Sequence, residues 1–164
     1  MGPTSGGKTT LARHFEAAWR ERGVPVIVYD GDEVRDLFGE DHGFRPEDRM
    51  RVVSVLVHLA NKAVAAGLNV IVSALTAHED ARRYIGESVC GLTVGYVECS
   101  IERCAERDPK GLYERARKGE ITTLIGWNTP YEPPQAPDLV LNTETRSLDD
   151  LFVEADTLLR PENG

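Results

Sequence analysis

The chain opens with MGPTSGGKTT, which contains the pattern G-x-x-x-x-G-K-[ST]. Glycines let backbone N–H groups of such a loop point at phosphate oxygens, and the N-terminus of the following helix favours the same negative charge. Lys8 supplies a charge for the β- and γ-phosphates, and the Thr9 hydroxyl can coordinate Mg²⁺. The alternative is a glycine-rich tail that matches by chance. The pattern predicts a site for a nucleoside triphosphate and Mg²⁺, formed by Gly2, Pro3, Thr4, Ser5, Gly6, Gly7, Lys8, Thr9 and Thr10.

Short apolar runs alternate with amphipathic segments along the rest of the chain, which is typical of an α/β fold. We expect strands at 24–32, 68–74, 92–99 and 138–143, and helices at 9–22, 46–66, 78–87, 101–107, 112–118 and 147–159. With the phosphate loop, this alternation predicts a doubly wound parallel sheet of the P-loop kinase type. A length of 164 residues fits a single domain, 1–164. Residues 108–137 are too long for a plain connection and predict a lid.

The strand that normally delivers the chain into a phosphate loop has no counterpart before Met1. Without it a central position of the sheet lies empty, and its neighbours lose ladder hydrogen bonds. Three explanations stand open: the start is assigned too late, another segment fills the gap, or a second subunit donates an element. We favour a domain that was natively longer, or a truncated sheet with altered packing. Truncation would remove the anchor of the loop and weaken ATP binding.

The composition restricts the class of partner. The formal net charge is −8, so a basic field for nucleic acid is absent over the whole molecule. No apolar run approaches the ~20 residues of a membrane span, and no secretory signal is visible, which favours the cytoplasm. The three cysteines, Cys90, Cys99 and Cys104, lack the spacing of a metal site, and we expect them to act as small hydrophobic residues.

Two carboxylates follow the first predicted strand. Asp30 and Asp32 lie where the carboxyl end of a parallel strand delivers groups to a ligand. An acceptor hydroxyl needs a nearby base or an orienting carboxylate, and either aspartate could serve. The alternative for Asp-Gly-Asp is a plain turn. Lys8 alone does not separate a kinase from a switch GTPase or a motor ATPase, but a carboxylate placed for an acceptor hydroxyl favours a kinase.

Longer motifs bring in a specific resemblance. The stretches DGDEVR (30–35), HGFRPEDR (42–49), RDPKGLYERARKGEI (107–121) and TPYEPPQAPDLVLNT (129–143) resemble those of the adenylylsulfate kinase (APS kinase) family. The likeness covers nearly the whole chain. It implies transfer of the γ-phosphate of ATP to the 3′-hydroxyl of adenosine 5′-phosphosulfate (APS), giving PAPS in sulfate activation. It also implies Mg²⁺ and a homodimer.

The resemblance also implies a role for each matching residue. Asp30 and Lys8 correspond to the catalytic groups, with Asp30 orienting or deprotonating the 3′-hydroxyl. Thr9 and Asp32 correspond to the Mg²⁺ contacts, and Asp32 also to a substrate contact. The remaining substrate positions are clamps on the phosphosulfate, a base-stacking aromatic and lid residues: Arg35, Arg49, Phe44, Lys110, Gly111, Leu112 and Leu124. Planar, permanently charged guanidinium groups suit such an anion.

Several positions depart from the family pattern, and all of them fall in the expected pocket of the acceptor base. Val52 replaces an asparagine, Ala77 a proline, Glu79 an arginine and Leu124 a stacking phenylalanine. Loss of one stacked ring can cost roughly 1–3 kcal/mol. The departures raise two alternatives: a kinase for another nucleotide, such as a cytidine diphosphate derivative, and a catalytically weak binding or regulatory module. A switch GTPase is disfavoured because no N-K-x-D motif is present.

Overall fold

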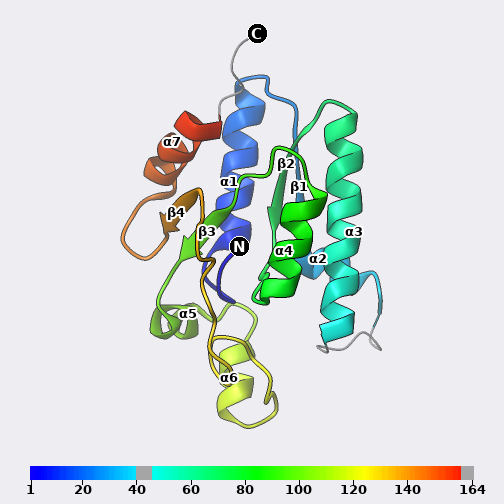
Figure 1. The fold of residues 1–164 in the computed structure, drawn as a ribbon. Coiled ribbons are helices and arrows are strands. Elements are labelled where there is room, and N and C mark those ends of the chain that lie inside the picture. Colours follow the sequence, from blue (N-terminus) through cyan, green and yellow to red (C-terminus); the bar gives the residue numbers. More distant parts are fainter. Residues whose placement is uncertain (40–45, 160–164) are drawn as a thin grey trace.

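The computed structural model describes residues 1–39 and 46–159. Within these ranges the strands are β1 (Val26–Asp30), β2 (Asn69–Ser73), β3 (Gly95–Glu98) and β4 (Leu139–Asn142). The longer helices are α1 (Lys8–Glu21), α3 (Pro46–Ala65), α4 (Glu79–Ser88) and α7 (Leu148–Leu159). The shorter ones are α2 (Gly31–Asp36), α5 (Ile101–Arg107) and α6 (Leu112–Arg117). The alternation of strands and helices confirms the α/β class (Figure 1).

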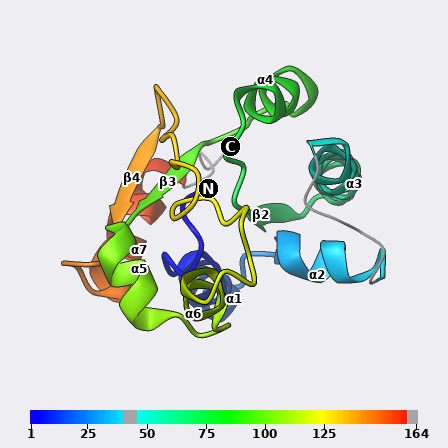
Figure 2. The same cartoon turned by 90° about the horizontal axis from the view of Figure 1, so that it is seen from below.

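The strands are parallel, as predicted, but they form two pairs. β1 pairs with β2 from Val26↔Asn69 to Asp30↔Ser73, and β3 pairs with β4 from Gly95↔Leu139 to Glu98↔Asn142. Helices cover both faces, as buried parallel strands require. α3 and α4 lie on one side of the strands, and α1 with α7 lies on the other (Figures 1 and 2).

One apolar core joins the two strand pairs through α1. Leu11, Phe15 and Trp19 recur at helical spacing on one face of α1, so they point together at the strands. This face packs against residues of both pairs and against α7, namely Val26, Val97, Leu139, Leu141, Leu151, Phe152 and Ala155. At the α1–α7 contact, the Trp19 indole donates a hydrogen bond of 2.9 Å to buried Asp156. Helix α1 therefore fixes both strand pairs relative to the phosphate loop at its N-terminus.

The structure adds one helix that the sequence prediction lacks. Asp30 ends β1 and also caps α2, because its Oδ1 accepts a hydrogen bond of 2.8 Å from the backbone N–H of Asp32. The Asp-Gly-Asp segment is therefore a direct strand-to-helix junction and not a plain turn. The predicted strand at 92–99 is shorter, since only Gly95–Glu98 pairs with β4.

The segment 108–137 contains α6 and a return loop that crosses toward β4 (Figure 2). It is anchored to the phosphate loop, because the fully buried Tyr113 donates from its hydroxyl to Thr4 O at 3.0 Å. Cys99 directly follows β3 and Cys104 lies on α5, both buried, whereas Cys90 is exposed. Among the described helices, none is long and apolar enough to cross a membrane.

Candidate active site

The phosphate loop lies between Met1 and the start of α1. Ser5 and Gly7 have φ angles of 60° and 92°, in the left-handed region that lets consecutive N–H groups face one concavity. The Lys8 ammonium folds back over the loop and donates to Pro3 O at 2.6 Å. This conformation preforms a cradle for an anion at the N-terminus of α1.

Residues outside the motif hold the phosphate loop in place through hydrogen bonds. The Thr143 hydroxyl, just after β4, donates to Gly6 O at 2.6 Å. Arg107, at the end of α5, donates to Thr143 O at 2.6 Å and lies beside Gly7. Neither Thr143 nor Arg107 was among the predicted site residues. Both lay inside quoted stretches, Arg107 at the start of RDPKGLYERARKGEI and Thr143 at the end of TPYEPPQAPDLVLNT, so a signal was present for each.

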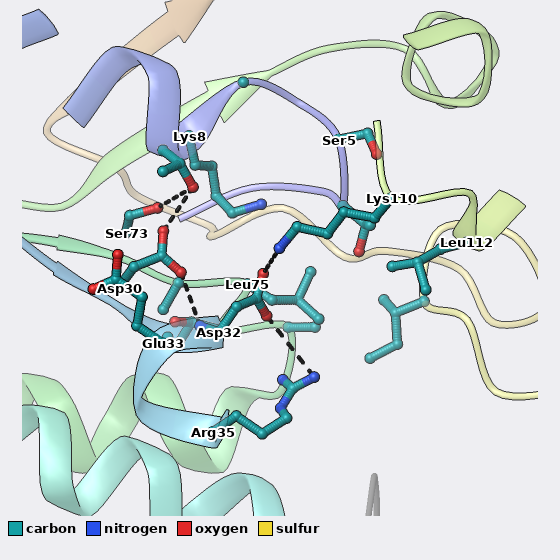
Figure 3. A pocket seen from close by; sticks show the side chains of 18 of the residues that line it. Ser5, Lys8, Asp30, Asp32, Glu33, Arg35, Ser73, Leu75, Lys110 and Leu112 are labelled. Carbon is teal, nitrogen blue, oxygen red and sulfur yellow. Dashed lines mark hydrogen bonds and ion pairs between the residues drawn. The ribbon is translucent and has the colours of Figure 1, made fainter. Parts of the chain in front are cut away.

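Asp30 lies directly opposite the start of α1. Its Oδ2 accepts a hydrogen bond of 2.6 Å from the Thr9 hydroxyl, and Ser73 Oγ lies 3.3 Å from the same hydroxyl (Figure 3). Asp30 and Ser73 are paired residues at the carboxyl ends of β1 and β2, and both are buried. The predicted proximity of Asp30 to the phosphate loop is therefore present. Ser73 is a further polar group here that the sequence reading missed.

The segment 108–137, predicted as a lid, contacts this site through Asp32. Lys110 Nζ lies 2.5 Å from Asp32 Oδ2, and Arg35 lies 3.9 Å from the other carboxylate oxygen (Figure 3). Partial desolvation opposes ionisation of Asp32, but the Lys110 ammonium and the Arg35 guanidinium outweigh it and lower the pKa of that carboxyl. Two residues predicted to contact substrate and metal thus form an ion pair across the mouth of the site.

Two cationic side chains, Arg35 and Arg49, line the same cavity. Burial, followed by the nearby positive charge of Arg35, lowers the pKa of Arg49. Arg35 comes from α2 and Arg49 from the first turn of α3. Two guanidinium groups that repel each other at one surface are stabilised when a multiply charged anion lies between them.

These groups line one cavity of about 910 Å³. Thirteen predicted residues border it: Thr4, Ser5, Gly7, Lys8, Thr9, Thr10, Asp30, Asp32, Arg35, Arg49, Lys110, Leu112 and Leu124. Gly2, Pro3, Gly6 and Gly111 are not part of its lining, and Pro3 is fully buried behind the loop. The prediction for Phe44 lies outside the described residues. Such a volume accommodates nucleotide-sized ligands.

Three of the four positions that depart from the family pattern border the same cavity, and the fourth, Glu79, is not part of its lining. Val52 and Ala77 are part of its lining, together with Leu56 and Ala81. Leu124 is 8% exposed and packs against the cluster of Cys104 and Tyr113. This wall of the cavity is therefore apolar and aliphatic. Arg146, Ser147 and Leu148 line the cavity beyond the phosphate loop and were not predicted.

The site contains oxygen ligands that suit Mg²⁺. Thr9 Oγ1, the Asp30 carboxylate and Ser73 Oγ converge at the loop. Mg²⁺ binds through one or two protein oxygens, with waters and phosphates completing its octahedron. Among the described residues, no cluster of three or more His, Cys, Asp or Glu side chains could hold a metal by protein ligands alone. The donor set therefore fits an ion that arrives with a phosphate ligand.

Binding of a nucleotide to the loop should depend on pH through Lys8. Burial lowers the pKa of Lys8 to about 8, partly opposed by Asp32, Cys104 and Asp30, and the Lys110 charge lowers it further. Above that pH the Lys8 amine is neutral in the unliganded loop and must take up a proton when phosphate binds. The affinity for nucleotide should therefore fall by up to about tenfold per pH unit. Titration calorimetry with a non-hydrolysable ATP analogue from pH 7 to 9.5 measures this loss. In Lys8→Ala the binding should be weaker but should not show this fall, and a fall of the same size there would contradict the assignment.

Comparison with known proteins identifies the family of the chain. The model of the Adenylylsulphate kinase family matches residues 1–142. The chain is 37% identical to the probable adenylyl-sulfate kinase of Bacillus subtilis, over 87% of this chain and 73% of that protein. It is 36% identical to the probable adenylyl-sulfate kinase of Aeropyrum pernix, over 90% of this chain and 83% of that protein.

Solved structures give the same result. The Mycobacterium tuberculosis APS kinase CysC, solved in complex with AMPPNP and APS, superposes with a TM-score of 0.89. It is 33% identical, with 98% of this chain and 95% of that chain covered. A shikimate kinase from Aquifex aeolicus has a TM-score of 0.56 at 20% identity, which shows the shared fold alone. On the match to the family model and these identities, the chain belongs to the adenylylsulphate kinase family.

Proposed function

We propose that the protein transfers the γ-phosphoryl group of ATP to the 3′-hydroxyl of APS, forming PAPS and ADP. The observation that carries this assignment is the position of Asp30. Its buried carboxylate lies 2.6 Å from the Thr9 hydroxyl, beside the Lys8 loop and in the same cavity as Arg35 and Arg49. A phosphate cradle, a carboxylate and an anion clamp around one space are the parts that a nucleotide kinase needs.

On the donor side, the loop residues 4–10 would hold the phosphates of ATP, and Lys8 would neutralise charge that develops on the transferred group. Mg²⁺ would be held by Thr9, with Asp32 as the second predicted contact, and would neutralise charge between the phosphates. Support for Asp32 in that role comes from its position on the cavity wall, although Lys110 pairs with it in this structure. Lys110 would exchange this partner for the acceptor.

On the acceptor side, Asp30 would accept a hydrogen bond from the 3′-hydroxyl and take its proton as the bond to phosphorus forms. Arg35 and Arg49 would bind the phosphosulfate, supported by their proximity on one wall. Phe44, Gly111, Leu112 and Leu124 remain proposed contacts of the acceptor and lid. The aliphatic wall at Val52 and Leu124 supports apolar contact with a base.

The comparisons do not favour the alternatives. The matched relatives are adenylyl-sulfate kinases, so neither a cytidine nucleotide as acceptor nor a regulatory module is proposed here. Assembly as a homodimer, action in the cytoplasm and the absence of nucleic acid among the partners remain predictions. The net charge of −8 supports the last of these.

The assignment is tested by APS-dependent release of ADP. We expect turnover with APS and none with AMP or CDP, because only APS carries the phosphosulfate that the two arginines recognise. In Arg49→Ala the KM for APS should rise at least about tenfold, the loss of one charge-assisted contact, with the KM for ATP unchanged. The matched control is Arg51→Ala, an exposed arginine two residues farther along α3 that does not line the cavity. Stronger turnover with a cytidine nucleotide than with APS would overturn the proposal.

A further inference from the structure

Asp108 joins α5 to α6 and is hydrogen-bonded to both helices. Its backbone N–H donates to Cys104 O at 3.0 Å, which completes the last turn of α5. Its carboxylate accepts two backbone N–H groups from the first turn of α6, from Tyr113 at 3.1 Å and from Glu114 at 3.0 Å. Gly111, at the cap position of α6, has no side chain that could accept them. Asp108 therefore supplies the cap that α6 lacks at its own N-terminus.

Residues 108–111 form a tight turn between the two helices. The N–H of Gly111 donates to Asp108 O at 3.0 Å, which closes a β-turn. Asp at the first position, Pro at the second and Gly at the fourth are favoured in such turns. Asp108 has a φ of 23°, in the left-handed region where residues other than glycine are uncommon and Asp and Asn are enriched. A residue keeps such a conformation only where its surroundings hold it, and here the two bonds to α6 do so.

Lys110 is the third residue of this turn. Its ammonium lies 2.5 Å from Asp32 Oδ2, at the site where donor and acceptor groups meet (Figure 3). The Lys110 side chain is 54% exposed, so packing fixes little of its direction. A lysine carries its charge on a flexible four-carbon stem, and the place that the charge can reach depends on where the backbone puts the start of that stem. The turn therefore decides which part of the cavity the ammonium reaches.

We propose that Asp108 is a positioning residue for Lys110: its carboxylate holds the turn that directs the Lys110 ammonium at the anionic group of the acceptor. Asp108 is not part of the cavity lining, although Arg107, Pro109 and Lys110 are, so it acts through the backbone and not by contact with a substrate. The inference rests on the proposed function, in which Lys110 exchanges Asp32 for the acceptor.

The ATP side of the site does not depend on this carboxylate in the same way. Helix α6 is tied to the phosphate loop by Tyr113, whose hydroxyl donates to Thr4 O at 3.0 Å. The Tyr113 side chain is fully buried in an apolar cluster with Cys104 and Leu124, and this packing holds it whether or not α6 is capped. Loss of the Asp108 carboxylate should therefore weaken binding of the acceptor and leave binding of ATP nearly unchanged.

The test is a double-mutant cycle on the full chain, with dissociation constants for APS and for a non-hydrolysable ATP analogue measured by titration calorimetry. Asp108→Ala should weaken APS binding at least about fivefold, the usual effect of losing a cap, and change binding of the ATP analogue less than about twofold. Lys110→Ala should weaken APS binding at least about tenfold, as expected for a lost charge-assisted contact. Adding Asp108→Ala to Lys110→Ala should weaken it no further, because no ammonium remains to be directed.

Two further variants separate the carboxylate from the backbone conformation. Asp108→Asn keeps one oxygen that can accept an N–H group and tolerates a left-handed φ, so APS binding should stay within about threefold of the original. Asp108→Gly removes the strain but also the acceptor oxygens, so its APS binding should resemble that of Asp108→Ala. Full APS affinity in Asp108→Gly would overturn the role of the carboxylate.

The matched control is Asp138→Ala. Asp138 Oδ2 also accepts a backbone N–H, from Val94 at 2.7 Å, but Asp138 directly precedes β4 and does not line the cavity. Both dissociation constants should be unchanged in this variant. The proposal is overturned if Asp108→Ala binds APS as tightly as the original, or if it weakens APS binding equally with and without Lys110. The cycle measures binding alone, so a coupled cycle without APS-dependent ADP release would count against the proposed function only, and release of ADP with an uncoupled cycle against this inference only.

Discussion

Replacing Lys8 by alanine should lower kcat for APS-dependent ADP release by at least about 10³. The ammonium lies over the phosphate loop, 2.6 Å from Pro3 O, at the only place in the motif where a side-chain charge can reach the transferred group. Removing one preorganised group that stabilises transition-state charge typically costs 10²–10³, and the loss of a full charge should lie at the upper end or beyond. Steady-state kinetics at saturating ATP and APS measure the effect.

The matched control is Lys62→Ala, which removes an exposed lysine from α3. Its kcat should equal that of the original protein. Because burial lowers the pKa of Lys8, the charged lysine is a destabilising group below pH 8, and Lys8→Ala should fold at least as well as the original. A loss of activity that accompanies a loss of thermal stability would therefore not support the assigned role. An unchanged kcat in a folded Lys8→Ala variant would contradict it.

The second large effect is expected for Asp30→Asn. Its kcat should fall by about 10²–10⁴, the usual contribution of a positioned base, while ATP binding persists. Asparagine keeps one oxygen, which can accept from the backbone N–H of Asp32 and preserve the cap of α2. The substitution therefore tests the carboxylate charge and not the strand-to-helix junction. Titration calorimetry with an ATP analogue, together with kcat, separates binding from chemistry.

Asp149→Asn provides the matched comparison for this variant. Asp149 is 88% exposed on α7 and does not line the cavity, so its kcat should be unaffected. If Asp30→Asn turns over as fast as the original protein, Asp30 serves only as a helix cap and a partner of Thr9. In that case Asp32 becomes the residue to test, since it is the other carboxylate that follows β1.

The phosphate loop and the strands were predictable because each depends on residues close together in sequence. A G-x-x-x-x-G-K-[ST] motif determines its own backbone conformation, because the left-handed φ at Gly7 and the helix start at Lys8 are local properties. Helix α1 follows from the spacing of Leu11, Phe15 and Trp19. Helix α2 was missed because its six residues contain too few apolar positions to show a period, and its cap comes from the last residue of β1.

Contacts that join distant segments were not predictable in the same way. The chain of hydrogen bonds from Arg107 through Thr143 to Gly6 joins three elements, and its geometry depends on how α5 and β4 pack. Ser73 reaches Thr9 only because β2 lies in register with β1, with Ser73 opposite Asp30. The ion pair of Lys110 with Asp32 joins residues 78 positions apart. None of these residue types is unusual enough in sequence to mark its partner.

The sequence by itself determined the phosphate-binding chemistry, the α/β class and the family, because a loop that binds phosphate needs particular residues at fixed spacing. Only the tertiary structure decided that Lys110 pairs with Asp32 and that the Met1 backbone hydrogen-bonds to Gly95 and Val97 of β3. Both depend on distances across the fold, which follow from how α1 packs the two strand pairs together.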